Sequence, residues 1–145
     1  MPQSASYYPD LCLVHLRVWG PVRLAFLAAR MAEWMYEFNV PEGYHCLTDL
    51  RQLSALDQAR SGMQELVTMQ ARVYQDVAAP DRSAILANTP MGILAARLFE
   101  QHAEGVLQEK LRVVRDEKAA LRFLGFAAGG LDVLLQGHPN ARHLE

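Results

Sequence analysis

Apolar runs that suit buried strands alternate along this chain with stretches of helical periodicity. The clearest examples lie in the second half, where an apolar run at residues 81–88 precedes helical spacing at residues 91–103. Residues 111–115 and 116–125 repeat the same order of strand and helix. Thr89 stands at one junction, where a hydroxyl favours the start of a helix. The pattern predicts two successive strand–helix units in this half.

The first half of the chain opens with a strand at residues 11–19, where alternate positions give one purely apolar face. This face is expected to meet the core and consists of Cys12, Val14, Leu16 and Val18. Gly20-Pro21 is expected to end the strand. A helix is predicted at residues 22–38 from an apolar stripe that comprises Leu24, Leu27, Ala28, Met31, Trp34, Met35 and Phe38.

A second strand is predicted at residues 44–50, followed by a loop at residues 51–56. Asp57 is a suitable N-cap for a helix that extends to about residue 77. The chain therefore contains four successive β-α units. Short connections between such units give a largely parallel sheet covered by helices, so the predicted fold class is α/β.

Length and composition indicate one ordinary globular domain. The chain has 145 residues, of which 51% are hydrophobic and 21% charged, and its formal net charge is −2. We expect a single domain at residues 1–125 and a C-terminal extension at residues 126–145, with a vector-derived remnant at residues 144–145. This charge favours no nucleic-acid partner, and no stretch is apolar enough for membrane insertion. The N-terminus lacks the features of a signal peptide, so we expect a cytoplasmic protein, and the preference for arginine over lysine suggests a bacterial source.

Four short motifs occur in the order and spacing of a known family. They are Val18-Trp19-Gly20, residues 47–51 (Leu-Thr-Asp-Leu-Arg), residues 96–100 (Ala-Arg-Leu-Phe-Glu) and residues 113–121 (Val-Val-Arg-Asp-Glu-Lys-Ala-Ala-Leu). With the four β-α units, they resemble the SpoIIAA-like fold of bacterial anti-sigma-factor antagonists (STAS domains) and their uncharacterised relatives. The resemblance is closest to the uncharacterised relatives. It implies a module that binds a protein partner.

The resemblance also points to a lost phosphorylation switch. Antagonists of this type carry an Asp-Ser-Ser-Gly run at the start of the second helix, and the second serine is phosphorylated. In this chain Asp57 matches the aspartate, and Ala59 stands at the phosphoacceptor position. Because alanine has no hydroxyl, the switch cannot operate there, and neither Ser54 nor Ser61 is in register.

Cysteine and histidine residues occur close together near two strands. Cys12 and His15 are expected on opposite faces of the first strand, and His45 and Cys46 on opposite faces of the second. This arrangement and the absence of a Cys-x-x-Cys motif favour unpaired structural cysteines, with no metal site and no cofactor.

An anion or ligand could bind at the turn that carries Asn88, Thr89 and Gly92, because free amide groups at the N-terminus of a helix favour anions. The alternative is a simple capped helix. Asp49 and Asp57 could similarly form an acid–base pair, or serve as a turn residue and a cap. No catalytic triad is evident from local spacing, so we predict that the protein is not an enzyme.

The first helix is apolar on more than one face, since Phe26 and Tyr36 lie off its core stripe. A second apolar face needs a cover. Either residues 131–135 provide the cover within the chain, or a second copy does so in a homodimer, which we favour.

These observations predict a non-enzymatic binding or regulatory module without the phosphorylatable serine. The alternative is a carrier of a small apolar or lipid-like ligand, because CRAL-TRIO domains have a similar β-α core and bind such ligands. A deep apolar cavity between helices and sheet would favour the carrier, whereas a solid core would favour the module.

Overall fold

The computed structural model describes residues 3–57 and 59–145 and contains a six-stranded sheet in the order β5-β4-β3-β2-β1-β6. Its strands are β1 (Gln3–Tyr8), β2 (Leu13–Arg23), β3 (His45–Asp57), β4 (Arg82–Leu86), β5 (Lys110–Val114) and β6 (Arg142–Leu144). Its helices are α1 (Leu24–Phe38), α2 (Ala59–Val73), α3 (Pro90–Ala103), α4 (Glu117–Leu124) and α5 (Leu131–Leu135), with a 3₁₀ turn at Pro9–Leu11. Strands β2 to β5 are parallel, and each is followed by a helix, which confirms the α/β class and the four β-α units.

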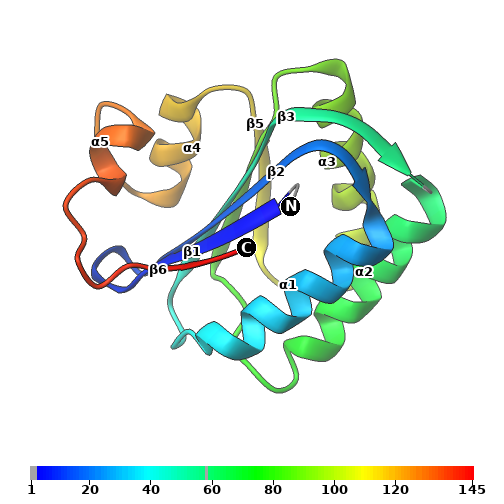
Figure 1. Ribbon diagram of the computed structural model, residues 1–145, viewed down its shortest axis with the longest axis horizontal. Coiled ribbons are helices and arrows are strands. Elements are labelled where there is room, and N and C mark those ends of the chain that lie inside the picture. The colour runs from blue at the N-terminus through cyan, green and yellow to red at the C-terminus, as the bar shows by residue number, and fades with distance from the viewer. Residues whose placement is uncertain (1–2, 58) are drawn as a thin grey trace.

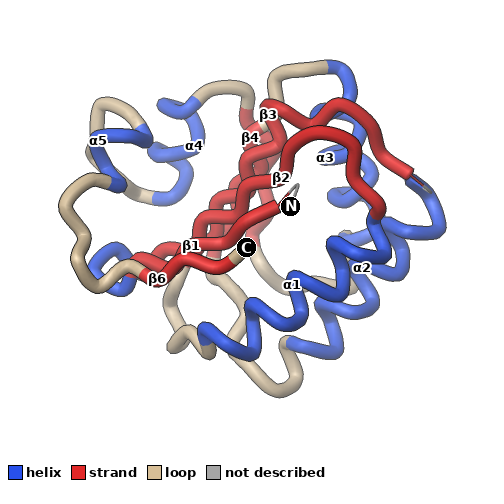
Figure 2. The backbone as a smooth tube through the Cα atoms, viewed as in Figure 1, coloured by secondary structure: helices blue, strands red, loops and turns tan. Residues whose placement is uncertain are grey.

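Helices cover both faces of the sheet unequally. Helices α1, α2 and α3 pack on one face, whereas the shorter α4 and α5 lie on the other (Figure 1). The tube in Figure 2 shows the strands running between these two groups of helices. Val14, Leu16 and Val18 point into the core beneath α1–α3, which confirms the predicted apolar face of the first strand. Leu13 and Leu47 belong to the opposite core, beneath α4 and α5.

Strands β2 and β3 are longer than the sequence predicted. Gly20-Pro21 does not end β2, and residues 51–56 are not a loop, because the two strands stay paired as far as Arg23 and Asp57. The pairing register shifts between Gly20 and Pro21, and Gly20 has a φ of +68°. Glycine adopts this conformation at no steric cost, so the irregularity bends the strand without ending it.

Strands β1 and β6 were not predicted. Strand β1 pairs antiparallel with β2, and β6 pairs antiparallel with β1. The strand predicted from residue 11 begins only at Leu13, because Cys12 follows the 3₁₀ turn in a left-handed conformation with φ of +49°. Cys12 therefore does not lie on the strand.

The start of α3 agrees with the predicted cap at Thr89, and Asp116 caps α4 in the same way. The Thr89 side chain accepts a hydrogen bond from the Gly92 amide at 3.1 Å, and the Asp116 side chain accepts one from the Ala119 amide at 2.7 Å. Helix α1 begins at Leu24 and α2 ends at Val73, so both are shorter than predicted.

The start of α2 tests the predicted Asp57 cap only in part. The structure places Asp57 as the last residue of β3 and begins α2 at Ala59. The junction at residue 58 lies outside the described residues. The capping role of Asp57 stays a prediction.

The C-terminal residues contact the same sheet. Leu131 is buried in the core beneath α4 and α5, and Leu144, which we attributed to vector sequence, pairs with Ala5. Helix α5 thus lies on the face opposite α1. The suggestion that residues 131–135 cover the outer face of the first helix is wrong.

Candidate functional site

Two hollows lie on opposite faces of the sheet. The first is an apolar cavity of about 80 Å³ between the sheet and α1–α3. Its wall includes Trp34 and Met35 from α1, Met63 from α2, Phe99 from α3 and Leu50 from β3. An apolar cavity in this position is the feature that favours the carrier function.

The cavity wall also holds a few polar atoms that the fold leaves without partners. Gln70 is only 5% exposed, and its Oε1 has no hydrogen-bond partner among the described residues, while its Nε2 lies 4.0 Å from the Met31 sulfur. The Trp34 Nε1 likewise has no partner in the part of the chain that the structure describes. Buried polar atoms are nearly always hydrogen-bonded in native proteins, so such atoms suggest a role in binding.

Glu109 lies between this cavity and the surface. Its side chain lines the cavity and also a surface groove of about 380 Å³ beside α3. Burial raises the pKa of Glu109 to about 7, although the nearby Ser83 side chain acts in the opposite direction. The Tyr44 hydroxyl, also in the wall, donates to the Ala78 carbonyl at 2.9 Å.

The second hollow is a polar cleft of about 570 Å³ on the other face, lined by β1, β2, β3, β6 and α5. His15 lies in its floor with 7% exposure, and its Nε2 has no partner within residues 3–57 and 59–145. Burial lowers the pKa of His15 to about 4 despite the opposing effect of Asp49. The ring is therefore neutral at physiological pH.

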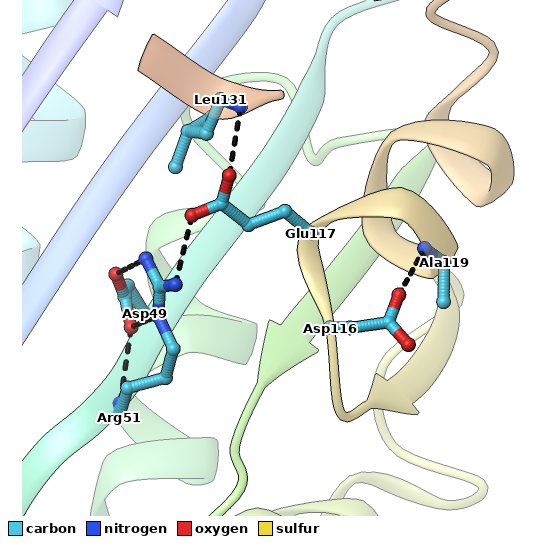
Figure 3. Close-up of polar contacts among 6 residues, drawn as sticks. All are labelled: Asp49, Arg51, Asp116, Glu117, Ala119 and Leu131. Carbon is cyan, nitrogen blue, oxygen red and sulfur yellow. Dashed lines mark hydrogen bonds and ion pairs between the residues drawn. The ribbon is translucent and has the colours of Figure 1, made fainter. Parts of the chain in front are cut away.

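A network of charged side chains stands beside this cleft (Figure 3). Arg51 donates to Asp49 through Nε at 3.1 Å and Nη2 at 2.8 Å, and to Glu117 through Nη1 at 2.8 Å. The other Glu117 oxygen accepts the Leu131 amide at 2.9 Å. Burial would raise the pKa of Asp49, but the hydrogen bonds from Arg51 lower it overall.

The network joins two of the sequence motifs that are far apart in the chain. Asp49 and Arg51 come from the motif on β3, and Glu117 from the motif at the start of α4. Their opposite charges were the signal for this contact, which the sequence analysis missed. Because its charges are paired, the network holds α4 and α5 to the sheet, and Arg51 is not free to pair with a ligand.

At the turn where we predicted an anion site, backbone amides are bonded within the turn itself. The Gly92 amide is bonded to Thr89, whose carbonyl accepts the Ile93 amide at 2.9 Å. A side chain at Gly92 would come within 2.9 Å of the Leu50 carbonyl, so the backbone packs closely there. The arrangement is that of a capped helix. Ligand binding at Asn88, Thr89 and Gly92 remains a prediction.

Asp49 and Asp57 do not form an acid–base pair. Both lie on β3, eight residues apart, which corresponds to roughly 26 Å of strand. The Oδ2 atom of Asp57 instead lies 3.9 Å from Nε of Arg23. Ala59 is the first residue of α2.

Both cysteines are free thiols in the structure. Cys12 is exposed and Cys46 is buried, and burial raises the pKa of the Cys46 thiol to about 12. Within residues 3–57 and 59–145, no group of three or more His, Cys, Asp or Glu side chains is arranged to hold a metal ion.

Phe26 and Tyr36 lie on the outer surface of α1. They are 63% and 48% exposed, and the Tyr36 hydroxyl donates to Asp76 at 2.7 Å. Both residues are accessible to a partner.

Comparison with solved structures shows a remote likeness. The structure is similar to that of the anti-sigma factor antagonist SpoIIAA in its unphosphorylated form, with a TM-score of 0.44 and 18% sequence identity over 80% of this chain and 93% of that chain. No protein-family model and no curated protein matches the chain. SpoIIAA is of the group that the sequence motifs resemble, but a likeness this remote assigns neither family nor function. None of the described helices combines the length and hydropathy needed to cross a membrane.

Proposed function

We propose that this chain is a non-enzymatic binding module, and that the cavity beneath α1–α3 takes a small, mostly apolar molecule. The supporting observation is an apolar cavity whose wall holds the buried, unpartnered Gln70 Oε1 and Trp34 Nε1. Ligand sites are typically apolar with a few polar groups that fix orientation. This makes the carrier function the better supported of the two sequence predictions.

The volume of the cavity limits the size of the ligand. The cavity of about 80 Å³ is smaller than an engineered cavity of about 150 Å³ that binds benzene. A short alkyl chain suits this space, whereas a long lipid chain requires the helices to move apart.

The polar groups on the other face of the sheet also favour a binding protein over an enzyme. The Ser6 hydroxyl and His143 Nδ1 are 2.7 Å apart, as in a nucleophile–base pair, but they are an exposed cross-strand pair. No carboxylate contacts His143 among the described residues to orient it. Ala59 also removes the phosphoacceptor, so regulation in this module would come from ligand binding.

The test is binding of short n-alkanols, which carry no charge. Calorimetry and thermal unfolding should show saturable binding and a higher Tm, because a ligand stabilises the state that binds it. Ala96→Val, which adds volume to the cavity wall, should abolish binding. Ala120→Val, in the opposite core beneath α4, should not. If no alkanol binds the wild-type protein saturably, the proposed function is wrong.

A further inference from the structure

Glu109 is a half-buried acid in a wall that is otherwise mainly apolar. Among the described residues that line the cavity there is no lysine, arginine or histidine to act as its counter-ion. The ionisable groups that face Glu109 are Tyr44 and Cys46 from the β3 side and Tyr74 from the end of α2. None of these can carry a positive charge.

The surface groove beside Glu109 is acidic as well. The surface groove that reaches it is lined by Glu100, Gln101, Ala103, Glu104, Leu107, Glu109 and Leu111, without a basic residue. Arg97 pairs with Glu100 at 3.0 Å on the exposed surface of α3. Lys110 lines a different hollow, with Arg82 and Arg112. A groove with one sign of charge raises the local concentration of ligands of the opposite sign.

The interior offers acceptors, which a cationic head group needs. An ammonium group has three donors and no acceptor. Besides the Glu109 carboxylate, the wall contains the unpartnered Oε1 of Gln70, which is buried. Apart from these atoms, the wall is mainly apolar and suits an alkyl chain.

We propose that the cavity binds a short-chain aliphatic amine, whose ammonium group pairs with Glu109 and whose alkyl chain lies among the side chains of α1–α3. This inference rests on the proposed function, since it names the head group of the ligand in the same cavity. A carboxylate in a poorly hydrated site stabilises a cation more than it does in water. The charge therefore selects amines over alcohols of equal length.

The experiment compares n-alkylamines, from propylamine to hexylamine, with the matching n-alkanols by calorimetry. At pH 8 each amine should bind the wild-type protein at least about tenfold more tightly than its alkanol, as expected for a charge-assisted bond. Glu109→Gln should remove this advantage. Glu104→Gln, in the exposed part of the groove, is the matched control and should change amine affinity less than about threefold.

The pH dependence of the wild-type protein gives a second readout that needs no variant. Glu109 is ionised above its pKa of about 7. An alkylammonium stays charged throughout, because its pKa is near the 10.4 of lysine. For a tenfold advantage, amine affinity should therefore fall about sevenfold from pH 8 to pH 5.5 and approach that of the alkanol, whereas alkanol affinity should not fall.

The outcomes separate the two proposals. If alkanols bind but amines bind no better, or if Glu109→Gln leaves the amine advantage intact, the assignment of the head group is overturned and the apolar site stands. If neither class binds, both proposals fail.

Discussion

The two faces of the sheet differ in how completely helices cover them. Helices α1, α2 and α3 have 15, 15 and 14 residues and enclose an apolar cavity. Helices α4 and α5 have 8 and 5 residues and leave a polar cleft over β1–β3. Long helices thus give one face a dry interior, whereas the short helices on the other face need ionic contacts to hold their position.

Each face also holds an ionisable group whose pKa is shifted by burial toward the neutral form, with opposite consequences for stability. Burial raises the pKa of Glu109 to about 7 and lowers that of His15 to about 4. The unfolded chain ionises Glu109 first as the pH rises, so this face loses stability between about pH 4.5 and 7. The unfolded chain protonates His15 first as the pH falls, so the other face loses stability between about pH 6.5 and 4.

The largest effect should come from the ionic network that holds the short helices. Arg51→Ala leaves Asp49, whose side chain is 14% exposed, without its partner, and it releases Glu117. We expect a loss of about 3 kcal/mol in the free energy of unfolding, at the lower end for a broken buried pair because Arg51 is partly exposed. Urea unfolding at pH 7 measures this loss.

Arg97→Ala is the matched control for this prediction, because it breaks an exposed pair on α3 and should cost about 0.5 kcal/mol. Amide exchange should also quicken in α5 of Arg51→Ala and not in α1. Equal losses in the two variants would show that the network does not hold the less covered face.

The strands show how far the sequence could predict these two faces. Alternation in residues 11–19 correctly predicted that Val14, Leu16 and Val18 enter the core, because the side-chain period of a strand is two. It was wrong for Cys12, which lies before the strand. Gly20-Pro21 was misleading, since a local breaker does not show that β2 and β3 continue their pairing past a bulge. Strand β6 escaped prediction because its partner β1 lies at the other end of the chain. Strand β1 pairs with the neighbouring β2, but its short and partly polar sequence shows no clear apolar face.

The candidate site was less predictable than the fold. The cavity is a space between side chains of three helices and the sheet, and no local pattern marks it. Glu109 lies in the connection between α3 and β5, and its partial burial results from tertiary packing, which no local pattern predicts. The helix cap at Thr89 did follow from local sequence, because capping involves residues three apart.

The second prediction concerns His15 and the response to acid. Asp49 and Glu117 favour protonation of His15, and Arg17 and Arg51 oppose it, but burial dominates and lowers the pKa. Relative to His15→Gln, the wild-type protein should lose about 2 kcal/mol of stability from pH 7.5 to pH 4.5. Chemical unfolding at several pH values across this range measures the loss.

Glu109→Gln is the corresponding variant on the other face. The wild-type protein should lose stability as the pH rises from about 4.5 to 7, and Glu109→Gln should not. If the wild-type protein and both variants show the same dependence of stability on pH, burial does not shift the pKa values of His15 and Glu109.

The smallest effect on stability is expected for substitutions on the outer surface of α1, which should change the oligomeric state instead. We propose a homodimer in which a second copy covers the exposed side chains of Phe26 and Tyr36. Phe26→Glu should convert a dimer into a monomer in light scattering at micromolar concentration, with a stability change of the monomer within about 0.5 kcal/mol. Val133→Glu alters a residue of α5 that is 66% exposed on the opposite face, and it should leave the dimer intact. A monomeric wild-type protein would refute the dimer, and dissociation by Val133→Glu as well would place the interface elsewhere.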